Sequence, residues 1–84
     1  MSTSMLKIHC LGIMQSKTGS ALVEIDWPAD SQVETALADF GRQWPAAADE
    51  LGRCACAIGD AIVPRSYQLQ AGDELVLLPP VGGG

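Results

Sequence analysis

The chain has 84 residues and a formal net charge of −5, with ten acidic against five basic residues. This length forms one domain with a modest core, which favours a carrier or binding module over a self-contained enzyme with an enclosed active site. The acidic charge argues against nucleic acid as a partner, because phosphate backbones are bound by Lys and Arg clusters. The acidic charge is compatible with docking onto a basic surface of a partner protein. The alternative is that it serves only to keep the surface of this protein solvated.

No segment approaches the roughly 18 consecutive apolar residues of a membrane span. The first residues also lack the basic start and apolar run of a secretion signal. We therefore expect no membrane partner and a cytoplasmic location.

The first part of the chain predicts two strands. Residues 5–11 alternate in polarity and place Leu6, Ile8 and Cys10 on one face. Residues 21–27 form the second strand, which ends at a proline. The polar, glycine-bounded segment 12–20 between them is expected to be a hairpin loop.

A helix is predicted next. Ser31 and Glu34 fit a capping box, in which each side chain bonds a free backbone N–H of the first turn. Pro45 ends the helix, and residues 46–51 are expected to add a short helical turn. The apolar residues recur at helical spacing and would form one stripe facing the core: Val33, Leu37, Phe40 and Trp44.

The second half predicts three strands, over residues 53–58, 61–63 and 74–78. The last is apolar on both faces, which indicates a central place in the sheet. Tyr67 and Leu69 lie in the preceding loop and are expected to plug the open end of the core. Two strands, a helix and further strands indicate the α+β class.

The three cysteines are Cys10, Cys54 and Cys56. An odd number does not make a disulfide framework, and zinc normally takes four ligands. His9 would point to the opposite face of its strand from Cys10. We expect buried thiols in a reducing compartment and no bound metal, and their further role is left open.

The chain ends in residues 79–84, Pro-Pro-Val-Gly-Gly-Gly. Glycines without Cβ atoms can pass through a slot too narrow for any side chain, and would carry the Gly84 carboxylate to a reactive group inside a partner enzyme. The prolines end strand pairing and stiffen the root of the tail. The alternative interpretation is a frayed chain end or an expression remnant.

Three stretches resemble the MoaD family, the small subunits of molybdopterin synthase. They are the strand-turn-strand of residues 56–63, the Gly-Asp-Glu and apolar strand of residues 72–78, and the Pro-Pro-Val-Gly-Gly-Gly ending. The chain departs from the family pattern at Leu78, where an aromatic residue is common, and at Gln15 and Ser16, where an Arg-Glu pair is frequent. The resemblance implies a ubiquitin-like β-grasp fold over residues 1–78, a mixed sheet of about five strands with one main helix across one face. Residues 79–84 would be a flexible tail.

The resemblance also implies a sulfur carrier in molybdenum cofactor biosynthesis. An activating adenylyltransferase of the ubiquitin-activating (MoeB) type would use ATP and Mg to adenylate the Gly84 carboxylate, and a persulfide donor would convert it to a thiocarboxylate. The large synthase subunit (MoaE type) would receive the tail in a hetero-oligomer and pass the sulfur to cyclic pyranopterin monophosphate. The chain would be a non-catalytic carrier subunit that binds no cofactor itself. The tail residues divide into those threading into partner active sites, Gly82 and Gly83, and those docking on the partner, Leu78, Pro79, Pro80 and Val81.

Three alternatives stay open. The chain could carry sulfur for another pathway, of the thiamine thiazole or cysteine type. It could be a ubiquitin-like modifier conjugated through Gly84 to a target lysine. It could also be an interaction module with no chemistry at its end.

Overall fold

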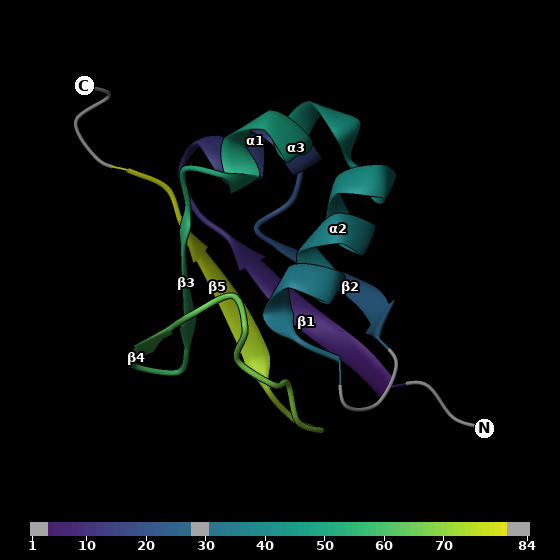
Figure 1. Cartoon of the computed structure of the whole chain (residues 1–84). Helices are drawn as coiled ribbons and strands as arrows, with labels where there is room; N and C mark the ends of the chain where they lie inside the picture. The colour runs from purple at the N-terminus through teal and green to yellow at the C-terminus, as the bar shows by residue number, and fades with distance from the viewer. Residues whose placement is uncertain (1–3, 28–30, 81–84) are drawn as a thin grey trace.

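The computed structural model describes residues 4–27 and 31–80. Over these residues the chain forms a five-stranded mixed sheet in the order β2-β1-β5-β3-β4, accompanied by three helices (Figure 1). The strands are β1 (Ser4–Cys10), β2 (Leu22–Trp27), β3 (Ala55–Ile58), β4 (Ala61–Val63) and β5 (Glu74–Leu78). The helices are α1 (Ile13–Thr18), α2 (Val33–Gln43) and α3 (Pro45–Leu51). The predicted α+β class is confirmed.

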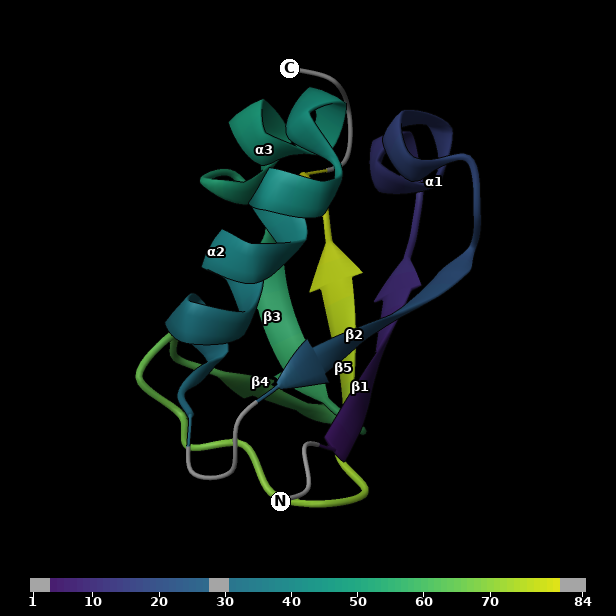
Figure 2. The same ribbon diagram turned by 90° about the vertical axis from the view of Figure 1, so that its right-hand side faces the viewer.

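The strand β5 lies at the centre of the sheet, as its two apolar faces predicted. It pairs parallel with β1 and antiparallel with β3. The outer strands β2 and β4 pair antiparallel with β1 and β3. Since β1 and β5 run in the same direction, both finish at the end of the sheet where α1 packs against α3 (Figures 1 and 2).

The core lies between the sheet and the helices. Leu6, Ile8 and Cys10 are fully buried, as their alternation predicted. The helical stripe of Val33, Leu37 and Phe40 is buried against them, and Trp44 is half-buried with its ring centroid 5.2 Å from that of Phe40. A helix stripe packed on one face of a sheet is the burial that period-3.6 patterning predicts. Leu69 is 1% exposed and Tyr67 packs against the core, so the predicted plug of the core is confirmed.

The hairpin loop predicted over residues 12–20 is wrong, because residues 13–18 form α1. Burial decides this conformation: Met14 is fully buried and anchors a helix whose other residues are mostly polar. Gly19 ends the helix in the left-handed region, at φ 81°, with its N–H bonded to the Gln15 carbonyl. Such a left-handed glycine is a common helix terminator.

The predicted capping box is also wrong. The helix α2 begins at Val33, with Gln32 as its N-cap residue and without a side-chain capping bond in the described part of the chain. The N–H groups of Val33 and Glu34 instead donate to the backbone carbonyls of Tyr67 and Arg65, each at 2.9 Å. Ser31 Oγ is buried without a hydrogen-bond partner among the described residues. A loop distant in sequence therefore satisfies the groups that Ser31 was expected to serve.

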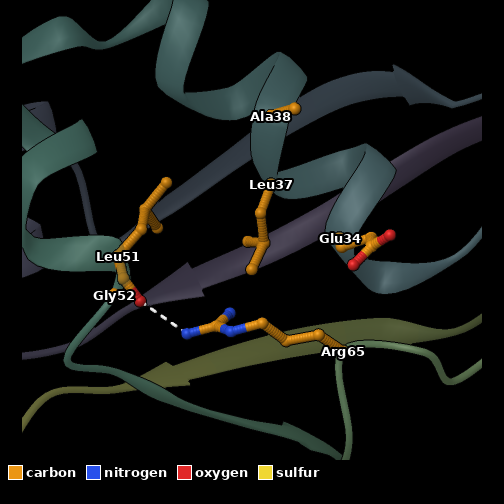
Figure 3. A pocket seen from close by; sticks show the side chains of 6 residues that line it. All are labelled: Glu34, Leu37, Ala38, Leu51, Gly52 and Arg65. Atoms are coloured by element: carbon orange, nitrogen blue, oxygen red, sulfur yellow. Dashed lines mark hydrogen bonds between the residues drawn. The ribbon is translucent and has the colours of Figure 1, made fainter.

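The side chain of Arg65 connects this loop to the end of α3. Its Nη2 donates to the carbonyl oxygens of Leu51, at 2.6 Å, and Cys54, at 3.0 Å. Figure 3 shows Arg65 reaching towards Leu51 along a hollow into which Leu37 also points. Because the last carbonyls of a helix lack intrahelical partners, Arg65 serves as a C-terminal cap for α3.

Within residues 4–27 and 31–80, the helices are all too short to cross a membrane.

Candidate functional site

The root of the tail leaves the sheet at the end of β5. Leu78 pairs with Ala55 of β3 and is half-buried, Pro79 is half-buried and Pro80 is exposed. These three predicted docking residues thus lie together at one end of the sheet. Val81 and the three terminal glycines lie outside the described residues, so the predicted threading and reactive positions remain predictions.

An apolar hollow of about 300 Å³ opens beside the tail root. One wall is formed by the tail root itself. The other comes from the junction of β1 and α1, where Leu11 and Ile13 are each 43% exposed. The lining residues are Leu11, Gly12, Ile13, Leu78, Pro79 and Pro80. The sequence did not indicate the residue 11–13 wall, because the parallel pairing of β1 with β5 is what brings these residues beside the tail root.

Gly12 lets these two walls approach closely. Its backbone lies at φ 54° and ψ −127°, outside the left-handed helical region that other residues occasionally adopt. A Cβ atom added there would lie 3.2 Å from Cγ of Pro79. A side chain at this position would therefore strain the backbone and press on the proline that directs the tail.

An apolar band crosses the outer face of the sheet next to the tail root. The strand registers align one residue from each strand in a row: Leu22, His9, Val76, Ala57 and Ile62. Leu22 is 41% exposed and Ile62 is 64% exposed. This row is thus apolar except for His9, and it is accessible mainly at its two edges, because Ala57 within it is only 5% exposed.

His9 is the polar member of this row and lies between Leu22 and Val76. Its Nε2 is 2.7 Å from Oε1 of Glu74, and this hydrogen bond lowers the pKa of the Glu74 carboxyl. His9 lies on the face of β1 opposite to the buried Cys10, as the sequence alternation predicted. Within the part of the chain that the structure describes, no three His, Cys, Asp or Glu side chains are grouped to hold a metal.

All three cysteines are buried free thiols, as predicted. Burial raises the pKa of each thiol, and for Cys56 the nearby Arg65 partly offsets the rise. The Arg65 guanidinium donates to Cys56 Sγ at 3.4 Å. Neutral buried thiols are poor nucleophiles, which argues for a packing role.

The family comparison matches residues 8–84 of the chain to the model of the ThiS family. The chain belongs to the ThiS family. The MoaD-like membership predicted from the last strand and the tail is thereby confirmed, because both lie within the matched residues. A comparison with curated proteins gave no significant match.

Solved structures share the fold of this ThiS family member. SAMP1 of Haloferax volcanii matches with a TM-score of 0.87 and 24% identity, over 96% of this chain and all (100%) of that one. Small archaeal modifier protein 1 of Methanosarcina acetivorans matches with a TM-score of 0.84 and 17% identity, over 100% of both chains. A chain in the complex of subunits 1 and 2 of molybdopterin-converting factor from Helicobacter pylori matches with a TM-score of 0.65 and 25% identity, over 95% of this chain and 99% of that one. The predicted ubiquitin-like β-grasp fold is confirmed.

Proposed function

We propose that the chain is the sulfur carrier subunit of a molybdopterin synthase. The observation that carries the proposal is the likeness to a chain of the molybdopterin-converting factor complex, at 25% identity over 95% of this chain. The Pro-Pro-Val-Gly-Gly-Gly ending agrees with it, and its first two residues, Pro79 and Pro80, lie beside an accessible apolar hollow.

The chemistry belongs to the terminal carboxylate of Gly84. A carboxylate is a poor electrophile, so an activating partner of the MoeB type would first adenylate it, using ATP and Mg bound by that partner and releasing pyrophosphate. The outer sulfur of a persulfide donor would then displace AMP and form an acyl disulfide with the Gly84 carbonyl. A second thiol of the donor would attack the donor's sulfur in that disulfide, forming a donor disulfide and releasing the thiocarboxylate. In the large subunit the thiocarboxylate would give its sulfur to cyclic pyranopterin monophosphate.

The described surface suits the docking that this chemistry needs. The hollow at the tail root and the outer apolar band together offer a partner apolar area, which is the main source of favourable free energy in association. Pro79 and Pro80 restrict the tail root and so reduce the entropy lost when it is fixed, about 1–2 kcal/mol per backbone residue. This arrangement supports a hetero-oligomer with the large subunit.

Reconstitution with a tail-deleted control tests the proposal. The thiocarboxylated chain, the large subunit and cyclic pyranopterin monophosphate are expected to yield the dithiolene product. A variant without Gly83 and Gly84 is expected to unfold at the same temperature as the full chain and to yield no dithiolene product. The proposal fails if no product forms while the same chain supplies sulfur to a thiazole-forming or cysteine-forming acceptor system.

Conjugation to proteins is the second candidate function. The fold likeness to two small archaeal modifier proteins favours it. Here the activated Gly84 carboxylate would form an isopeptide bond with a target lysine. Higher-mass conjugates that persist in reducing gels, and that disappear when Gly83 and Gly84 are deleted, would favour this function over sulfur transfer.

A further inference from the structure

The free edge of the sheet at β2 has an open stretch of backbone. In Figure 2, which views the molecule from the β2 side, β2 borders the sheet and no described strand pairs with its outer edge. The Cys10 N–H donates to the Ala21 carbonyl at 2.8 Å, and these two residues continue the register of β1 and β2. In an antiparallel ladder, residues whose N–H and C=O groups bond the neighbouring strand alternate with residues whose groups point the other way. Ala21, Val23 and Ile25 are thus the residues that bond β1. The backbone groups of Leu22, Glu24 and Asp26 therefore point away from the sheet.

The first of these three positions is closed by a side chain. Ser20 Oγ donates to the Leu22 carbonyl at 2.8 Å and lies 3.4 Å from the Leu22 nitrogen, so it occupies both outward groups of that residue. Among the described residues, no group occupies the outward N–H and C=O of Glu24 and Asp26. Two donors and two acceptors thus remain for an added strand.

The side chains around the unpaired backbone of Glu24 and Asp26 indicate which kind of strand could pair with it. Glu24 and Asp26 are exposed on the outer face, and neither carboxylate forms an ion pair within the described residues. Lys7 lies opposite Glu24 in the ladder, and Met5 lies opposite Asp26. A second copy of the chain is a poor occupant, because a two-fold pairing centred on Ile25 would set Glu24 against Asp26, and like charges directly opposite each other are destabilising.

We propose that the Glu24–Asp26 edge of β2 binds an extended basic segment of a partner protein by strand addition. Two residues of that segment, spaced by one, would pair with Glu24 and Asp26 and place Lys or Arg side chains beside the two carboxylates. The residue between them would point to the other face of the sheet, where α2 packs against β2. An apolar residue fits there, so the recognised pattern is basic-apolar-basic. This surface uses no tail residue and is independent of the sulfur carrier function.

A short peptide with a central Lys-Val-Lys tests the proposal by NMR titration of the full chain at physiological salt. We expect signal shifts centred on residues 22–27 and slower hydrogen exchange at the amides of Glu24 and Asp26. A matched Glu-Val-Glu peptide should bind at least about tenfold more weakly, because both cross-strand pairs change from attractive to repulsive. The double variant Glu24→Lys/Asp26→Lys should reverse this preference.

Methylated peptides separate strand addition from simple charge attraction. Methylating the backbone nitrogens of the two lysines removes both donors that face β2 and should abolish binding. Methylating the valine nitrogen, which points away from β2, should leave binding intact. Equal binding of the two methylated peptides would overturn the proposal, as would shifts outside β2 or dimerisation of the chain through this edge.

Discussion

The substitution Gly12→Ala tests how the tail root is held. The backbone of Gly12, at φ 54° and ψ −127°, is outside the regions that L-residues normally adopt, and such strain costs about 1–3 kcal/mol. The added Cβ would also lie 3.2 Å from Pro79 Cγ, so the proline must shift. We expect the free energy of unfolding to fall by about 2–3 kcal/mol. The measurement is urea unfolding followed by tryptophan fluorescence, to which Trp44 contributes from its place against the core.

Gly19→Ala is the matched control for this substitution. Gly19 lies at φ 81° and ψ 8°, close to the left-handed helical region, and a Cβ there would meet no atom within 4 Å. Its expected loss is about 1 kcal/mol. Adding Pro79→Ala to Gly12→Ala should recover part of the difference between the two glycine variants, since it removes the ring that the new Cβ presses on. Equal losses for Gly12→Ala and Gly19→Ala, with no recovery, would refute the reasoning.

Three further predictions concern the core. Arg65→Met should lower the free energy of unfolding by about 2–3 kcal/mol, because the carbonyls of Leu51, at the end of α3, and of Cys54, just before β3, lose a charged donor. Arg65→Lys should restore only part of this loss, and chemical unfolding measures both variants. Ser31→Ala should change stability by less than about 0.5 kcal/mol, whereas a working capping residue would cost about 1 kcal/mol, so thermal melts decide between them. Cys10, Cys54 and Cys56 should resist a thiol reagent in the native chain and all react in denaturant. Since their folded pKa values are raised above the ordinary 9.0, the unfolded chain loses these protons first and stability should fall as pH rises above 9; a flat pH profile there would contradict this.

The strands and the main helix could be predicted from the sequence because their signals are local. One side of each element faces the core, and local patterns indicate which side it is. The pattern is the alternation of Leu6, Ile8 and Cys10 in β1, and the helical spacing of Val33 and Phe40 in α2. The resemblance in the last strand and tail then predicted the fold family, and it also predicts a reactive end at Gly84. Neither prediction depends on a contact between segments that are distant in sequence.

The errors arose where distant segments decide the conformation. Residues 13–18 look like a polar loop, and the buried side chain of Met14 makes them a helix. The sequence at the start of α2 predicts capping by Ser31. In the structure the first N–H groups of the helix donate instead to the backbone carbonyls of Arg65 and Tyr67. The hollow beside Pro79 depends in the same way on where α1 lies. A local residue pattern does not indicate such contacts between distant segments.

The intact mass of the chain tests the central claim most directly, because that claim concerns a single group, the carboxylate of Gly84. The chain would be incubated with ATP, an activating enzyme and a persulfide donor, then weighed by mass spectrometry alongside a variant that lacks Gly83 and Gly84. We predict a mass increase equal to the exchange of one oxygen for one sulfur, located by fragmentation at Gly84 and absent from the variant. An unchanged mass in the presence of competent partners, or a sulfur atom located on a cysteine, would contradict the account.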